Sequence, residues 1–526
     1  MTVKKRLVSA TSNEDEEVFE KSGKNSDSKK NEDTAVGTTV LNTKLRTIFK
    51  LFILGIVGPV ILYTLYHLSS SLQKHFAKIE IKEVLIKDRK PIYWVYGRNP
   101  DSGYLKHVFA VLDRLGFERG TNESDWDLLW AHDYPFRSLY SSLNALAPHQ
   151  KVNHVPGCGY ITNKVDLSTS ELARHLPAAF KIPEDKKALL KYVADNPAKS
   201  FVQKSNAHRG IQILNVSDID LASEGSFVQE FIENPFLVDG FKFDIGVYTV
   251  VTSVDPLRVY VYKGDILFRF CPVKYYPFDP ENIDKYVVGD DYLPIWDVPS
   301  LKNYYANLGF SMKDSFDSYV RAQGKDPQKV WDNVNDAIRD VILSKESLIK
   351  DVVKRFKNQH NFFEMMRFDF AIDDELNVFV MEANMSPNLS SAHYPPNQLL
   401  YEQVLFNLFG LVGIGQRVRK ESLRIRNQKE EEMQVADKNL VVLPEVCAKC
   451  DDCFRVECQL CKPCFTDETR HILSTSYREH QNAMDFQRIF PPPITKTMVL
   501  KDYTLKNQLL VRWYQGKCEL DPTWCG

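Results

Sequence analysis

Two short apolar runs joined by a tight turn constrain the fold of this 526-residue chain more than any other feature. The runs are MMRFDFAID and NVFVMEANM, and DDEL forms the predicted turn between them. Because strand side chains alternate between faces, Glu382 and Asn384 share one face, and a hairpin brings Asp369 beside them. Carboxylate and amide oxygens suit magnesium, and neighbouring carboxylates repel each other without a cation. The hairpin therefore predicts a magnesium site, with a solvated hairpin face as the alternative.

The rest of the chain alternates predicted strands and helices, which favours an α+β fold with mixed or antiparallel sheets. We expect a second hairpin turn at YKGD, residues 262–265, between two strands. Lys and Arg number 67 and Asp and Glu number 69, and this balance gives no argument for a nucleic-acid partner. The principal elements are expected as strands at 91–97, 126–133, 201–205, 210–214, 226–232, 242–254, 257–263, 265–270, 365–373 and 377–385, and as helices at 104–117, 315–358 and 398–413.

An uncharged apolar run from Leu51 to Tyr66 predicts a single-pass membrane anchor within residues 44–73. The run has about 16 residues, and more if His67 and the serines are included, against about 20 for a bilayer core. A polar, disordered tail (1–43) precedes it, and a stalk (74–90) follows. Basic residues flank both ends, so the positive-inside rule leaves the orientation open, with a slight lean toward a cytosolic N-terminus and a lumenal C-terminal region.

Two further segments have the residue types that bind a nucleotide. Lys204 ends a strand before the turn NAHRG, where Arg209 and the backbone N–H groups could cover phosphates. Gln229 and Glu230 lie in an apolar strand whose backbone could hydrogen-bond an adenine edge. An ordinary amphipathic strand is the alternative for that segment.

Several longer segments together resemble one protein family. WDLLWAHDYPF, HQKVNHVPGCGYITNK, VQEFIENPFLVDGFKFDIGVYTVVTS and FDFAIDDELNVFVMEANMSPNLSS are similar to the tubulin–tyrosine ligase-like family, over residues 91–410. The resemblance implies an ATP-grasp fold and an ATP-dependent amide bond on a protein carboxylate, made through an acyl phosphate. It also implies tubulin tails as acceptors and free glutamate as donor, with glycine as the alternative donor. Tubulin as acceptor favours a cytosolic ligase domain, and the charges around the anchor leave a lumenal one open.

The resemblance assigns roles to residues of this chain. For ATP, it implies that Lys164 and Lys204 hold the phosphates, that Gln229, Glu230 and Ile232 line the adenine, and that Lys242 and Asp244 lie by the ribose and phosphates. It implies that Arg269 faces the reacting centre. The residues that it implies for Mg2+ are Asp369, Glu382 and Asn384.

The chain departs from that family at Gly246, because it reads KFDIG where KFDIR or KFDLR is usual. The loop after Lys204 is also short, and YVVGDDYLPIWDVPSL replaces the family's LTN segment. Arg209 could substitute for the missing arginine. Two hypotheses remain: a divergent ligase, and a membrane-tethered pseudoenzyme that binds nucleotide or an acidic tail.

A cysteine cluster lies near the C-terminus, within an expected Cys-rich region (441–526) that follows a helical linker (411–440). CxxC pairs bind structural zinc when reduced and form disulfides in an oxidising lumen, and the total of ten cysteines is even. Both alternatives stay open for Cys447, Cys450, Cys453, Cys458, Cys461 and Cys464.

Overall fold

The chain divides into two compact units, Met1–Lys82 and Glu83–Gly526. In the first unit, residues 63–71 are helical. The expected tail, nearly all of the stalk and most of the apolar run lie outside the described residues, and among those described no helix has the length and apolar character needed to cross a bilayer. The structure is a computed structural model that describes residues 63–71, 73, 90–172, 174–205, 211–214, 216–415, 433, 435–495 and 499–526.

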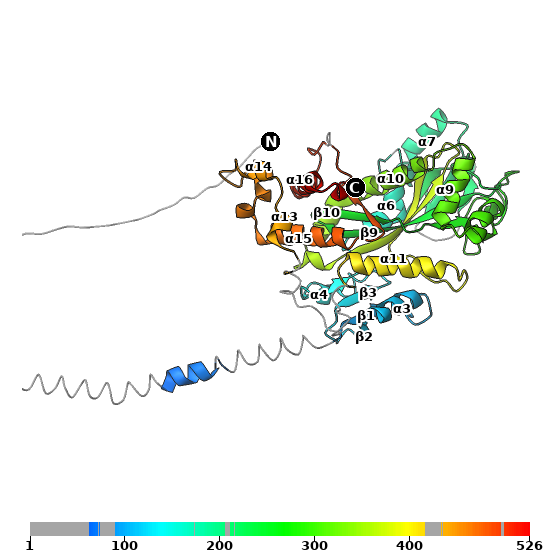
Figure 1. Cartoon of the computed structure of the whole chain (residues 1–526). Helices are drawn as coiled ribbons and strands as arrows, with labels where there is room; N and C mark the ends of the chain where they lie inside the picture. Colours follow the sequence, from blue (N-terminus) through cyan, green and yellow to red (C-terminus); the bar gives the residue numbers. More distant parts are fainter. Residues whose placement is uncertain are drawn as a thin grey trace, which may run out of the picture. The chain divides into compact units, whose positions relative to one another are not determined.

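A seven-stranded antiparallel sheet forms the centre of the second unit (Figure 1). Its strands are β9 (Phe243–Val254), β10 (Leu257–Tyr262), β11 (Leu267–Phe270), β12 (Leu293–Pro294), β13 (Glu364–Ile372), β14 (Val378–Asn384) and β15 (Phe486–Phe490). The 12-residue β9 pairs with β13 along one edge and with β10 and β11 along the other. Nearly every residue of β9 is buried, which explains why its sequence reads as an almost continuous apolar run rather than an alternating one.

The predicted hairpin at 262–265 is wrong. β10 lies opposite residues 249–254 of β9, and β11 lies opposite residues 243–246 of the same strand. Both are antiparallel to β9, so they run in one direction, end to end along one edge. Turn residues such as Gly264 mark a break in a strand, but they do not reveal whether the flanking strands pair with each other or with a third strand.

The predicted hairpin of β13 and β14 is confirmed. The two strands pair antiparallel, with Asp369 opposite Glu382 and Arg367 opposite Asn384. Asp369 also lies opposite Gly246 on β9. Residues directly opposite each other project to the same face of a sheet, so this register gathers polar side chains in one place.

Two smaller sheets complete the unit, and the α+β prediction is confirmed. The parallel sheet, in the order β2-β1-β3-β4, contains β1 (Ile92–Tyr96), β2 (Glu118–Arg119), β3 (Leu128–Ala131) and β4 (Lys151–Val152). The antiparallel sheet, in the order β5-β8-β6-β7, contains β5 (Ala179–Ile182), β6 (Phe201–Ser205), β7 (Gln212–Leu214) and β8 (Ser226–Glu230).

The helices pack on these sheets. The 26-residue α10 contacts β9, β10, β14 and β15, and its buried residues, such as Val334, Ile338 and Val341, recur at helical spacing and join the main core. The α-helices between residues 90 and 411 are α3 (Lys106–Arg114), α4 (Tyr140–Leu143), α5 (Gly159–Thr162), α6 (Lys164–Ser168), α7 (Lys186–Asp195), α8 (Pro299–Lys302), α9 (Met312–Ala322), α10 (Gln328–Val353) and α11 (Asn397–Leu411).

The C-terminal region builds a second core and also contributes to the central sheet. β15 pairs with β10, so the region is continuous with the sheet that carries the polar cluster. Its own core is built around Leu510, Trp513, Tyr514 and Trp524. The helices of the region, orange to red in Figure 1, are α13 (Asp437–Leu440), α14 (Pro444–Cys447), α15 (Asp467–Gln481) and α16 (Leu505–Leu520).

The cysteine cluster is bonded as disulfides, so the disulfide alternative is confirmed and the zinc alternative is wrong for this structure. Zinc binds thiolates, and every thiol of the cluster is used in an S–S bond. The two remaining cysteines, Cys158 and Cys271, are free and buried. The four bonds are Cys447–Cys461, Cys450–Cys458, Cys453–Cys464 and Cys518–Cys525.

Candidate active site

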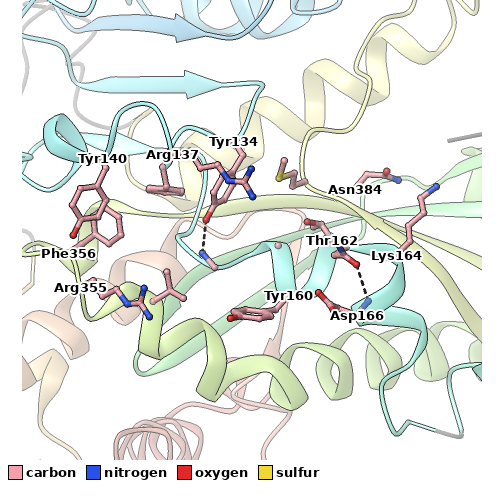
Figure 2. Close-up of a pocket in the computed structure, with 16 residues that line it drawn as sticks. Tyr134, Arg137, Tyr140, Tyr160, Thr162, Lys164, Asp166, Arg355, Phe356 and Asn384 are labelled. Atoms are coloured by element: carbon pink, nitrogen blue, oxygen red, sulfur yellow. Dashed lines mark hydrogen bonds between the residues drawn. The ribbon is translucent and has the colours of Figure 1, made fainter. Parts of the chain in front are cut away.

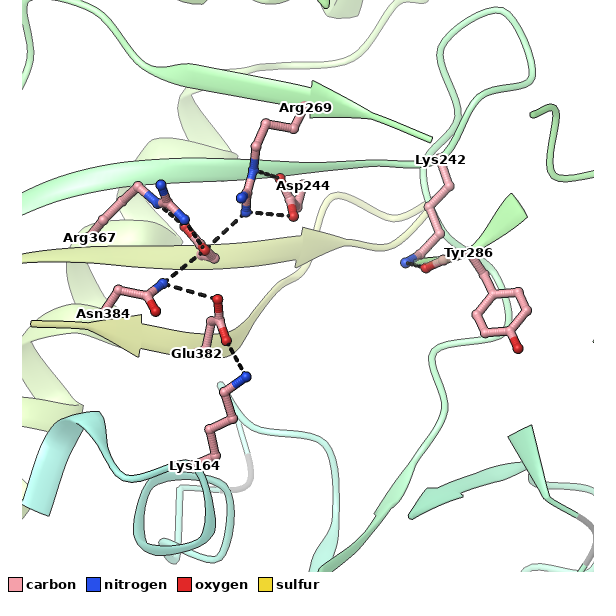
Figure 3. A network of polar contacts seen from close by, with 9 residues as sticks. Lys164, Lys242, Asp244, Arg269, Tyr286, Arg367, Glu382 and Asn384 are labelled. Carbon is pink, nitrogen blue, oxygen red and sulfur yellow. Dashed lines mark hydrogen bonds and ion pairs between the residues drawn. The ribbon is translucent and has the colours of Figure 1, made fainter. Parts of the chain in front are cut away.

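A cluster of charged side chains covers one face of the central sheet where β9, β11, β13 and β14 meet (Figure 3). Asp369 lies at its centre and is 2% exposed. Arg367 donates from Nε to Asp369 Oδ1 at 2.6 Å and from Nη2 to Oδ2 at 2.8 Å. Arg269 Nη2 donates to the same Oδ2 at 2.9 Å. Two guanidinium groups therefore neutralise this buried carboxylate.

Asp244 and Arg269 form the second pair of the cluster. They lie opposite each other on β9 and β11, and Arg269 donates from Nε and Nη2 to the two oxygens of Asp244, both at 2.8 Å. Burial raises the pKa of Asp244, and the Arg269 charge opposes that effect. Arg269 is thus shared between two carboxylates, as Figure 3 shows.

Glu382 receives its countercharge from a different element. Lys164 Nζ lies 2.8 Å from Glu382 Oε2. Lys164 is the first residue of α6, and the Asn163 side chain caps this helix by accepting hydrogen bonds from the N–H groups of Val165 and Asp166. Burial would raise the pKa of Glu382, but hydrogen bonds from Lys164 and Asn384 outweigh it and lower the pKa to about 2.

The donor set of the hairpin fits a hard cation. Asn384 Nδ2 donates to Asp369 Oδ2 at 3.1 Å and to Glu382 Oε1 at 3.0 Å, so three oxygen-bearing side chains converge as the sequence predicted. The amide nitrogen of Asn384, rather than its oxygen, faces the two acids. Rotation of the amide by half a turn exchanges the two atoms and presents three oxygen ligands, the set that magnesium prefers.

A cavity of about 230 Å³ opens beside this cluster. Apolar side chains, among them Val202, Phe227 and Met381, form part of its wall. The cavity gathers nine of the residues to which the family resemblance assigned a role at the nucleotide, the metal or the reacting centre: Lys164, Lys204, Glu230, Ile232, Lys242, Asp244, Arg269, Asp369 and Glu382.

Three lysines, Lys164, Lys204 and Lys242, line this cavity. Burial, followed by repulsion from Lys242 and Lys164, lowers the pKa of Lys204 to about 8. Lys204 Nζ donates to Gln229 Oε1 at 2.9 Å, and Lys242 Nζ donates to the Tyr286 carbonyl at 2.6 Å. A buried lysine whose pKa is lowered by neighbouring cations is stabilised in its charged form by an anion, and a phosphate group provides that anion.

The other residues predicted for the nucleotide site have different surroundings. The Gln229 side chain is buried, and its Nε2 has no hydrogen-bond partner in the part of the chain that the structure describes. Glu230 is bound by Tyr192 Oη at 2.7 Å and Lys199 Nζ at 2.6 Å. Arg209 lies outside the described residues. The segment that replaces the family's LTN sequence contributes to the cavity wall through Tyr286 and the two valines that follow it.

Arg367 is the residue that sequence reasoning missed. A signal was present, because Arg367 lies two positions before Asp369 and therefore projects to the same face of its strand. The same alternation that places Asp369 beside Glu382 therefore also places Arg367 beside them.

A larger cavity of about 860 Å³ lies next to the first (Figure 2). Lys164 lines both cavities, and Asn384 lines the larger one. Arg137 and Arg355 add two further cations to its wall. The aromatic side chains that line it are Tyr134, Phe136, Tyr140, Tyr160 and Phe356. The larger cavity is therefore suited to a ligand with both negative charge and apolar surface.

Comparison with known proteins supports a family relationship. The family model described as the tubulin-tyrosine ligase family matches residues 142–420, just over half of the chain. The protein called probable tubulin polyglutamylase ttll-15 of Caenorhabditis elegans is 42% identical over 481 residues, which are 87% of this chain and 91% of that protein.

Two mammalian proteins are more distant. Tubulin polyglutamylase TTLL6 of Mus musculus is 28% identical over 360 residues, 64% of this chain and 43% of that protein. Tubulin monoglutamylase TTLL4 of Homo sapiens is 28% identical over 331 residues, 58% of this chain and 26% of that protein. The chain therefore spans less than half the length of these two relatives. The matched family segment includes β9, β11, β13 and β14, which carry the charged cluster, and the chain belongs to the tubulin-tyrosine ligase family.

Proposed function

We propose that this protein is an ATP-dependent ligase that adds glutamate to glutamate side chains in the acidic tails of tubulin. The observation that carries the proposal is the convergence of Lys164, Lys204 and Lys242 on one cavity beside Asp369 and Glu382. Lysines that can bind phosphates, next to carboxylates that can hold magnesium, are the arrangement that phosphoryl transfer requires. The relatives above, which are named as polyglutamylases and a monoglutamylase of tubulin, support the same activity.

The reaction has two steps on the substrates. The γ-phosphoryl group passes from ATP to the acceptor carboxylate, releasing ADP and leaving an acyl phosphate. The amine of free glutamate then attacks the acyl carbon, phosphate leaves, and an amide bond forms. A magnesium ion held by Asp369, Glu382 and Asn384 would neutralise charge on the ATP phosphates.

The chain's own residues orient the reactants. The three lysines bind the phosphates, and Arg269 faces the group that reacts, in a site that is already charged and ordered before substrate arrives. Ile232 and the apolar wall pack against adenine, while the backbone around Gln229 and Glu230 hydrogen-bonds its edge. Asp244 lies on the side of the ribose and phosphates.

The larger cavity is the proposed site of the acidic tail. Arg137, Arg355 and Lys164 supply positive charge, and Tyr134 and Tyr160 supply apolar surface (Figure 2). Lys164 lines both cavities, so a carboxylate bound in the larger one lies near the phosphates bound in the smaller one.

The proposal is tested by incubating the full chain with magnesium ATP, microtubules and labelled glutamate, beside Lys204→Ala. Incorporation that Lys204→Ala abolishes supports a ligase, and competition by unlabelled glycine identifies the donor. ATP binding without any incorporation would instead support the nucleotide-binding tether, for which the missing arginine at Gly246 is the specific argument.

The anchor and the compartment are a separate proposal. The apolar run before residue 67 supports a single-pass membrane protein, and tubulin as acceptor requires the ligase unit to face the cytosol. The four disulfides favour the opposite side, because oxidising compartments maintain such bonds. They support a second candidate function, the same ligation on an acidic tail of a protein in that compartment.

Protease protection in sealed vesicles distinguishes the two orientations. If the C-terminal unit is digested without detergent, it faces the cytosol and tubulin is accessible. If it is protected, and its cysteines resist alkylation until reductant is added, the ligase faces an oxidising lumen and tubulin is excluded as the acceptor.

A further inference from the structure

The space above Gly246 is filled by a side chain from the neighbouring strand. A Cβ atom added at Gly246 would lie 2.8 Å from Arg367 Cδ and 3.2 Å from both Arg367 Nε and Asp369 Oδ1. Non-bonded carbon atoms are at their optimum at about 3.5–4.0 Å, so the added carbon would displace the guanidinium. The glycine is therefore what lets Arg367 reach Asp369.

Arg367 is held in a defined orientation. It lies opposite Tyr248 of β9 and Asn384 of β14, and it is 7% exposed. Its Nε and Nη2 atoms both bind Asp369, which is the bidentate geometry that fixes a guanidinium plane. Both of these hydrogen bonds to Asp369 are drawn in Figure 3.

Arg367 and Arg269 both bind Asp369, but only Arg367 binds it alone. Arg269 is divided between Asp244 and Asp369, whereas both hydrogen bonds of Arg367 go to Asp369 alone. If Asp369 turns its oxygens to a cation, the Arg367 guanidinium stays beside it because the strand fixes its backbone. A fixed positive charge is then retained next to the transferring phosphoryl group.

We propose that Arg367 is a positioning residue of this site, which orients Asp369 and supplies from β13 the positive charge that the KFDIR pattern would place at Gly246. The inference rests on the proposed function, because the charge matters for phosphoryl transfer. It is an alternative to the hypothesis that Arg209 substitutes for the missing arginine. It also makes Gly246 and Arg367 one paired feature: a side chain at 246 is compatible with the site only if Arg367 is removed.

The test uses the full chain in four forms: wild type, Gly246→Arg, Arg367→Gly and the double swap. Each single change is expected to lower kcat for glutamate incorporation by about 100-fold or more, with KM for ATP within about threefold, because the charge acts on the transferring group. The swap is expected to recover activity to within about tenfold of wild type. Arg174→Gly, which removes an exposed arginine, is the matched control and is expected to be unchanged.

A second readout does not depend on ligation. The magnesium concentration for half-maximal binding of a fluorescent ATP analogue is measured for the same proteins and for Gly246→Ala, the smallest change that displaces Arg367. Gly246→Ala and Gly246→Arg are expected to raise this concentration by about fivefold or more, and the swap is expected to restore it, since residues in direct contact are energetically coupled. Melting temperatures confirm that each variant is folded.

The outcomes separate the two claims. The wild type could incorporate no glutamate while the swap still restores the magnesium dependence of ATP-analogue binding. In that case the proposed function fails, but the energetic coupling between Gly246 and Arg367 stands. If the effects of Gly246→Arg and Arg367→Gly simply add in the swap, or Gly246→Ala leaves binding unchanged, the pairing is wrong. A gain of activity in Gly246→Arg alone would also overturn it.

Discussion

Arg258 of β10 and Glu479 of α15 form a buried, bidentate ion pair, with Nε donating to Oε2 at 2.8 Å and Nη2 donating to Oε1 at 3.2 Å. Thr252 and Tyr260 also donate to the same carboxylate, each at 3.0 Å. The pair links the central sheet to the Cys-rich region. The two regions therefore form one folding unit rather than a catalytic domain with an appended tail.

Glu479→Gln tests this linkage. The change leaves the buried Arg258 without its countercharge, which typically destabilises a protein by about 3–5 kcal/mol. We expect a lower melting temperature for the whole 83–526 unit in a single transition. Glu468→Gln, which removes the exposed partner of Lys506, is the control and should change the melting temperature little. Two separate transitions in the wild type would contradict the linkage.

The disulfide cluster should determine the stability of the C-terminal core. Cys447 and Cys461 close a loop with a sequence separation of 14, and closing a loop of this size typically contributes about 3 kcal/mol. We expect the Cys447→Ser/Cys461→Ser protein to melt earlier than wild type under non-reducing conditions. Under full reduction the two proteins should melt together. An unchanged melting temperature in the non-reduced double variant would show that this bond carries no stability.

Lys204 gives the site a pH dependence. Burial and the neighbouring lysines lower its pKa to about 8, so it carries a positive charge below that pH and loses the charge above it. Affinity for ATP should therefore fall as pH rises from 7 to 9, by up to about tenfold per pH unit above 8. In the unliganded protein the sign is opposite: the unfolded chain binds more protons between pH 8 and the ordinary lysine pKa, so stability rises with pH across that window.

The pH effect is checked by titrating a fluorescent ATP analogue at each pH. Lys204→Arg keeps its charge throughout this range and should give a flatter profile. A profile for Lys204→Arg with the same slope as wild type would assign the pH dependence to another group.

Glu382 should matter far more than the acids of the hairpin turn. Glu382→Gln removes one negative charge from the proposed magnesium set and removes the ion pair between residue 382 and Lys164. We expect about a 100-fold loss of glutamate incorporation and a higher magnesium requirement. Glu375→Gln, at the exposed turn of the same hairpin, should be active at the wild-type level. Equal effects of the two changes would remove Glu382 from the metal set.

The sequence predicted those parts of the site that depend on local geometry. Asp369 and Glu382 could be placed together because strand alternation and a tight turn fix a hairpin's register. Lys164 and Lys204 come from α6 and β6, remote in sequence from the hairpin, and only the family resemblance assigned them to the same site. Arg367 was missed although its spacing from Asp369 placed it on the same face.

Other features depend on contacts that no local pattern determines. β10 and β11 were predicted to form a hairpin, but both pair with β9 instead. The residues of the turn between them do not indicate whether the flanking strands pair with each other or with a third strand. The cysteine spacing fitted zinc and disulfides equally, and six cysteines allow 15 pairings that sequence cannot distinguish. The structure pairs Cys450 with Cys458 and Cys453 with Cys464, which brings together the two halves of the cluster.

Mass spectrometry of tubulin tails is the measurement that tests the central claim most directly. Microtubules are incubated with the full chain, magnesium ATP and glutamate, and the tail peptides are compared with those from Glu382→Gln and from a reaction without ATP. The account predicts mass increments of whole glutamyl residues on acceptor glutamates, present only with ATP and the wild-type chain. Unmodified tails, from protein shown in the same experiment to be folded and to bind ATP, would contradict it.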